Sequence, residues 1–137
     1  MLVKLFLSFP FILLSLNLFA NDEIPKDCKE DLPIIEKSFY GNWTEIRKGL
    51  VSYITYNSDN TFTGRVERKG KVAIFDGTWF LDGKIKHLNY TRYKDGKIKK
   101  GTSIDEILQV TCNEYKFKYI KSGRIGSLKR IKHITNR

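Results

Sequence analysis

From residue 42 onward the chain consists of short runs that alternate apolar and polar side chains, and each run ends in a turn signal. The clearest run is 61–67, where Phe62 and Val66 fall on one face and polar residues fall on the other. Alternation with a period of two is typical of a half-buried β-strand. Pairs such as Asp82-Gly83 between runs are typical of tight hairpins. This pattern constrains the fold more than any other feature of the sequence.

The pattern predicts about eight strands at hairpin spacing. An antiparallel meander of this length is best satisfied by closure into a barrel, because closure removes the exposed strand edges. The predicted fold is therefore all-β, an antiparallel meander closing into a small barrel, with an open two-layer sandwich as the structural alternative. The expected strands are 43–47, 51–56, 61–68, 72–81, 84–93, 104–112, 115–121 and 125–134.

Two of these runs break the alternation. Ile85 and Leu88 fall on opposite faces of one run, and the last run has the same conflict near Lys129. A β-bulge adds one residue to a strand and so moves the following side chains to the other face. We therefore expect one bulge near His87 and another near Lys129.

The first twenty residues have the features of a secretory signal peptide. Lys4 precedes an apolar run over 5–19, and the small residue Ala20 follows at a plausible cleavage point. A membrane-spanning helix needs about 20 apolar residues, and this run is shorter and contains polar residues. We expect cleavage, a secreted or periplasmic location and no transmembrane segment in the remaining chain; an uncleaved anchor is the alternative.

Between the signal peptide and the strands we expect a polar arm and a short helix over 21–38, followed by the barrel domain over 39–137. The helix is predicted at 33–39, because Leu32, Ile35 and Phe39 are spaced for one helical face. Gly41 is expected to end it.

The two cysteines, Cys28 and Cys112, both lie in the part expected to be exported. An even cysteine count in an oxidising compartment predicts one disulfide, with two buried free thiols as the alternative. With two His and no Cys-x-x-Cys spacing, the sequence predicts no metal site. It also contains no motif for a cofactor.

Positive charge is concentrated in the second half of the chain. Residues 84–137 carry fifteen Lys and Arg against four Asp and Glu, whereas residues 21–83 carry nine against eleven. Such asymmetry indicates the kind of partner rather than the fold. For an exported protein the candidates are an anionic lipid surface, an acidic glycan or an acidic protein, and nucleic acid is excluded by compartment.

No catalytic site is predicted. The acidic residues form no pair that spacing can define, and His87 and His133 are far apart, each next to a Lys. Neither a nucleophile elbow nor a phosphate-binding Gly-x-x-x-x-Gly-Lys loop is present in the sequence. We therefore expect a binding protein and not an enzyme.

Aromatic residues make up 13% of the chain, largely at strand positions. Those on the faces expected to point inward are the candidates for ligand contact. An eight-stranded barrel has room either for filling side chains or for one small ligand, and the sequence leaves both open. The candidates are Phe62, Phe75, Trp79, Tyr115, Phe117 and Tyr119.

Two short segments resemble lipocalins and lipocalin-like small barrels. The segment 39–43, with Gly41-x-Trp43, is similar to the family's opening signature, and 75–83 is similar to its Gly-x-Trp hairpin segment. The resemblance implies binding of a small apolar or amphipathic molecule. It also implies that Arg130, on the last strand, packs over Trp43 in a cation–π contact of about 0.5–2 kcal/mol and closes one end of the barrel. A ligand is then expected toward the other end.

Overall fold

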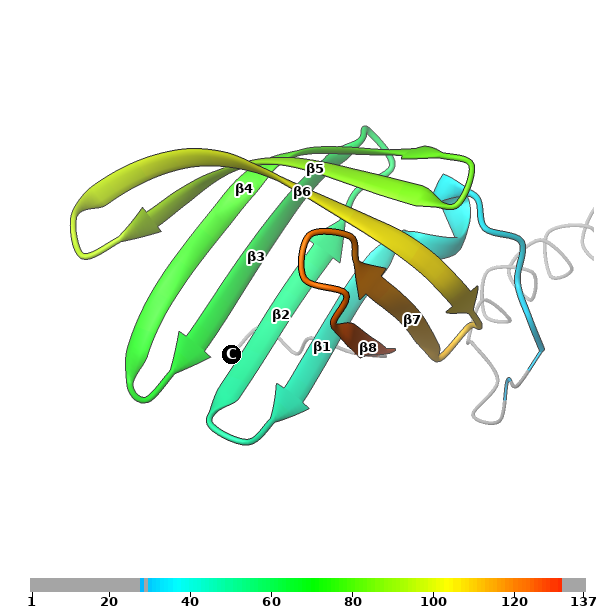
Figure 1. The fold of residues 1–137 in the computed structure, drawn as a ribbon, viewed down its shortest axis with the longest axis horizontal. Helices are drawn as coiled ribbons and strands as arrows, with labels where there is room; N and C mark the ends of the chain where they lie inside the picture. Colours follow the sequence, from blue (N-terminus) through cyan, green and yellow to red (C-terminus); the bar gives the residue numbers. More distant parts are fainter. Residues whose placement is uncertain (1–27, 29, 132–137) are drawn as a thin grey trace, which may run out of the picture.

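The computed structural model of the chain describes Cys28 and residues 30–131. The predicted signal peptide at 1–20 lies outside the described residues, as do 21–27, 29 and 132–137. Eight antiparallel strands follow one another in sequence order and close into a barrel (Figure 1). The all-β meander is therefore confirmed, and closure excludes the open sandwich.

Each strand pairs with the next one along the chain, and β8 returns to β1 through the pairs Trp43 with Arg130 and Thr44 with Lys129. This short β1–β8 ladder is what closes the barrel. The strands are β1 (Gly41–Arg47), β2 (Leu50–Tyr56), β3 (Thr61–Arg68), β4 (Lys71–Asp82), β5 (Ile85–Lys94), β6 (Lys97–Val110), β7 (Glu114–Tyr119) and β8 (Ile125–Arg130).

Strand β6 is longer than predicted, because it begins at Lys97 and not at residue 104. The additional residues, 97–103, pair with β5 in an extended hairpin. β6 pairs with β7 from Asp105 onward, so within the described strands 97–104 pair with β5 alone. Most side chains of this segment are exposed and three of the seven are Lys, which removes the alternation that predicts a strand.

The predicted helix over 33–39 is reduced to one 3-10 turn, η1 (Glu36–Phe39). Ahead of it, Asp31 forms a bridge with Thr111, and the Leu32 amide donates to the Val110 carbonyl at 2.8 Å. Because these contacts hold the chain extended against the end of β6, room remains for only a single turn before β1.

The two bulges expected near His87 and Lys129 are wrong. The β4–β5 and β5–β6 registers run unbroken through His87, and the β7–β8 register runs unbroken to Lys129. The register shift lies instead between Ile107 and Gln109, on β6. The alternation in β5 fails because its inward face begins with a charged residue, Lys86, which is buried.

Candidate functional site

One end of the barrel is filled by an aromatic plug, which consists of Phe39, Trp43 and Trp79. All three side chains are at most 1% exposed. The Phe39 ring, delivered by η1, lies 6.4 Å from the Trp43 ring and 6.2 Å from the Trp79 ring. The Trp43 indole also donates a hydrogen bond to the Phe39 carbonyl at 2.7 Å. The turn η1 is thereby anchored inside the barrel's end.

Arg130 lies over this plug, with its guanidinium carbon 4.2 Å from the centre of the Trp43 ring. The guanidinium also donates to three backbone carbonyls, those of Ser38, Tyr40 and Cys112, at 2.6–2.9 Å. Burial lowers the pKa of Arg130 from its usual value. These bonds join η1, the residue that precedes β1 and the β6–β7 turn to β8.

Gly41 leaves room for that arrangement. It has a φ of +119°, and a Cβ at this position would lie 2.9 Å from a terminal nitrogen of Arg130. The predicted disulfide joins the same region, since Cys28 is bonded to Cys112 in the β6–β7 turn. The residues predicted to be structural therefore meet at one end of the barrel.

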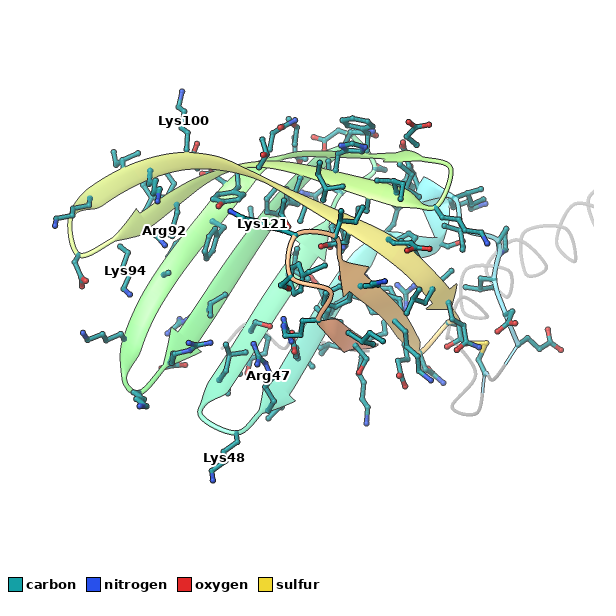
Figure 2. The ribbon with its side chains drawn as sticks, viewed as in Figure 1. Arg47, Lys48, Arg92, Lys94, Lys100 and Lys121 are labelled. Carbon is teal, nitrogen blue, oxygen red and sulfur yellow. A yellow bond between two sulfur atoms is a disulfide. The ribbon has the colours of Figure 1, made fainter. Side chains whose placement is uncertain are left out.

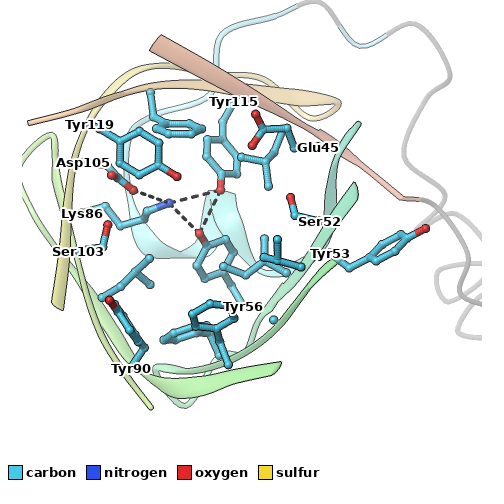
Figure 3. A pocket seen from close by; sticks show the side chains of 18 residues that line it. Glu45, Ser52, Tyr53, Tyr56, Lys86, Tyr90, Ser103, Asp105, Tyr115 and Tyr119 are labelled. Atoms are coloured by element: carbon cyan, nitrogen blue, oxygen red, sulfur yellow. Dashed lines mark hydrogen bonds and ion pairs between the residues drawn. The ribbon is translucent and has the colours of Figure 1, made fainter. Parts of the chain in front are cut away.

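The other half of the barrel contains a cavity of about 260 Å³ (Figure 3). Its apolar wall includes Ile54, Val66, Leu88 and Leu128, together with most of the predicted aromatics. Trp79 is the exception, because it lies in the plug with its ring 4.8 Å from that of Tyr56. The predicted aromatics that line the cavity are Phe62, Phe75, Tyr115, Phe117 and Tyr119.

Between the plug and the cavity lies a polar layer formed by Tyr56, Lys86, Asp105 and Tyr115 (Figure 3). The Lys86 ammonium lies 3.6 Å from an Asp105 carboxylate oxygen. It also donates to the Tyr56 and Tyr115 hydroxyls, at 2.7 and 3.3 Å. The two hydroxyls are 3.0 Å apart and hydrogen-bonded to each other. All four groups thus form one connected network.

This network is deeply buried. Lys86 and Asp105 are 2% and 3% exposed. Burial raises the pKa of Asp105, and the nearby Lys86 charge opposes that rise. Burial also raises the pKa of Tyr115 well above its usual range, with the Tyr56 hydroxyl acting in the same direction. At neutral pH Tyr115 therefore keeps its hydroxyl proton.

Sequence reasoning did not find Lys86 or Asp105. Both occupy inward positions on their strands and face each other across the β5–β6 ladder. A charged residue in a strand is ordinarily expected at the surface. A signal was available: Leu88 and Tyr90 define the inward face of β5, and Lys86 shares their parity.

The turns at the cavity's end of the barrel form a basic rim, defined as residues 47–50, 68–71, 94–97 and 119–125. The rim carries nine Lys and Arg against one Asp. The turns at the plugged end, residues 56–61, 82–85 and 110–114, carry one Lys against three acidic residues. The charge asymmetry therefore follows the barrel axis as well as the two halves of the sequence.

Basic residues also extend inward from the rim. Figure 2 shows Arg92 and Lys94 on the inner side of the β5–β6 hairpin and Lys100 on its outer side. Glu45, which lines the cavity, pairs with two rim residues, Arg47 at 3.0 Å and Arg124 at 3.6 Å. A molecule that enters the cavity at this end passes a mostly cationic border.

The fold and the cavity together define a small antiparallel barrel that is plugged at one end and hollow toward the other. Within Cys28 and 30–131, no cluster of three or more His, Cys, Asp or Glu is arranged to hold a metal ion. The same residues include no helix of the length and hydropathy needed to cross a bilayer. Comparisons with protein families, with curated proteins and with solved structures find no match.

Proposed function

We propose that the protein is an exported, lipocalin-like barrel that binds one small apolar or amphipathic molecule and catalyses no reaction. The observation that carries this proposal is the cavity of about 260 Å³ between the polar layer and the basic rim. Ligand sites are concave and mostly apolar, with a few polar groups that fix orientation. The cavity has this composition, and its size, near the lower limit for ligand sites, favours a small ligand.

The lipocalin-like part of the proposal is supported by the arrangement at the plugged end. Trp43 on the first strand lies under Arg130 on the last, after a single turn that enters the barrel. Export is supported by the disulfide between Cys28 and Cys112, because disulfides persist in oxidising compartments.

Native mass spectrometry of the protein purified from its own source, followed by organic extraction, tests ligand binding. We expect a bound mass that is lost in Leu88→Trp, which places an indole in the cavity wall. Ile98→Trp is the matched control, because Ile98 is 69% exposed on β6. A ligand-free native protein that also fails to bind any added amphiphile contradicts the proposal.

A second candidate function is docking of the basic rim on an anionic lipid surface. The specific observation is that four turns, distant in sequence, place their positive charge at one end of the barrel (Figure 2). Exposed charges of one sign attract an oppositely charged surface, and salt screens that attraction over about 10 Å at 0.1 M. Docking through the rim would present the cavity to the membrane surface.

Co-sedimentation with vesicles that contain anionic phospholipid tests this second function. Binding should fall steeply as salt is raised, and a fourfold charge reversal on the rim should abolish it. A control with the same net charge reverses four lysines outside the rim and should retain binding; equal loss in both variants would show only a dependence on net charge. The rim variant is Lys48→Glu/Lys94→Glu/Lys97→Glu/Lys121→Glu, and the control is Lys84→Glu/Lys116→Glu/Lys118→Glu/Lys129→Glu.

A further inference from the structure

The buried charges of the polar layer reduce the folding stability of the barrel compared with an apolar core. Moving a Lys and an Asp out of water carries a desolvation penalty of several kcal/mol per ion, and apolar residues of similar volume are often as stable or more stable. Lys86 and Asp105 nevertheless lie almost fully buried between the plug and the cavity. Their position on the cavity's inner boundary suggests a role in recognition.

The hydrogen-bond inventory of the layer shows what it can still bind. A Lys ammonium has three N–H donors, and Lys86 has three partners: it donates hydrogen bonds to Tyr56 and Tyr115 and is ion-paired with Asp105 at 3.6 Å. Each tyrosine hydroxyl has one hydrogen, and the bond between Tyr56 and Tyr115 uses only one of the two. One phenolic hydrogen therefore remains available for a further partner.

Asp105 supplies the complementary group. Its second carboxylate oxygen, Oδ1, is buried and has no hydrogen-bond partner within the described part of the chain. Most buried polar atoms in proteins are hydrogen-bonded, and leaving one unpaired costs about 1–3 kcal/mol. The layer therefore contains one acceptor and one donor hydrogen without partners, on residues that line the cavity.

This pair of free groups selects among possible ligand heads. A carboxylate only accepts hydrogen bonds and would lie beside the Asp105 carboxylate, and an ammonium only donates and would lie beside Lys86. A hydroxyl or a primary amide both donates and accepts, and it brings no charge to a layer whose formal charges already cancel.

We propose that the polar layer binds the uncharged hydroxyl or amide head of a small amphiphile, with its apolar part directed toward the basic rim along Leu88, Phe75 and Val66. This inference rests on the proposed ligand-binding function. The cavity of about 260 Å³ is near the lower end of the range for ligand sites, so the ligand is a small molecule.

Isothermal titration calorimetry with three probes of similar size tests the inference: 1-octanol, heptyl methyl ether and octanoate. The ether matches octanol in size and can accept a hydrogen bond but cannot donate one. We expect wild-type protein to bind octanol at least roughly tenfold more tightly than the ether, as a hydrogen bond to a charged acceptor predicts. Octanoate should bind more weakly than octanol.

The variant Lys86→Met/Asp105→Leu removes the ion pair with little change in volume and should reduce the octanol preference to near onefold. Equal wild-type affinity for octanol and ether, or an unchanged preference in the variant, overturns the inference and leaves the proposed function standing. If octanoate binds more tightly than octanol and its binding weakens as salt is raised, the ligand head lies at the basic rim, and this result also overturns the inference. Failure of the wild-type protein to bind any of the three probes counts against the proposed function itself.

Discussion

The two ends of this barrel differ in residue composition and in packing. At one end the aromatic plug, the Arg130 hydrogen bonds and the Cys28–Cys112 disulfide surround a fully buried Trp43. At the other end the turns are basic and exposed, and the strands surround a cavity. The boundary between the two is the polar layer, where Tyr56 and Tyr115 pack on the plug and bond to Lys86.

This division indicates that stability and binding are assigned to opposite ends. A barrel strand is continuous, so packing at one end holds the strands in register at the other. Interior cavities cost stability because their lining loses packing contacts. A well-packed plug can offset that loss, and the hollow half is then free to carry binding groups.

Removal of the disulfide is expected to have the largest effect on stability. In Cys28→Ser/Cys112→Ser the two residues, 84 positions apart, are no longer linked. The chain-entropy model for a loop of this length gives a loss of roughly 4–5 kcal/mol. Chemical denaturation of the variant and of the wild type, with and without reductant, measures it. A loss below about 1 kcal/mol would mean that the plugged end does not depend on its covalent link.

Trp43→Ala tests the packed side chains of the same end. Trp43 is fully buried, and truncation of a buried Trp to Ala costs about 3–5 kcal/mol. The control at the opposite end is Lys48→Ala, an exposed rim residue whose removal should change stability by no more than about 0.5 kcal/mol. Similar losses in the two variants, measured by urea unfolding, would contradict the division between the ends.

The plugged end was predicted from the resemblance of 39–43 to the opening signature of lipocalins, which implies that Arg130 packs over Trp43. The strands were predicted from alternation, because apolar residues at alternate positions mark the inward face of a strand. The turns were predictable as well, because residues such as Gly83 and Gly96 adopt a positive φ there. The strand count and the barrel followed from these two signals.

The polar layer was not predictable in the same way. A pattern that assigns apolar residues to the core places Lys86 and Asp105 on the surface, and it then requires a bulge to keep the strand regular. Their proximity depends on the β5–β6 register, which pairs residue 86 with residue 105. The charges of the rim come from four alternate turns, which an antiparallel meander places at the same end.

The polar layer also provides a comparison between single and paired substitutions. Lys86→Met leaves Asp105 buried without its counter-ion and should destabilise the fold by about 3–5 kcal/mol. Lys86→Met/Asp105→Leu removes both charges and should be neutral or stabilising by about 1–4 kcal/mol. Urea unfolding of the two variants measures both effects. If the double variant is as unstable as the single one, the polar layer is needed for stability in the same way as the plug.

The smallest expected effect is a pH dependence of the folding stability that arises from Asp105 in the polar layer. Burial raises the folded-state pKa of Asp105 above 3.8, so folding favours its protonated form. Its contribution to stability is therefore complete below that value and is lost as pH rises through the folded-state pKa. The attraction of Lys86 and Arg124 opposes the effect of burial, which keeps the change small.

Lys86→Met/Asp105→Leu lacks this titration, so its stability relative to the wild type should increase from about pH 3 to about pH 7. Urea unfolding of both proteins across that range measures the difference. A relative stability that is constant or falls with pH would show that the Asp105 carboxylate is as well solvated in the barrel as in the unfolded chain.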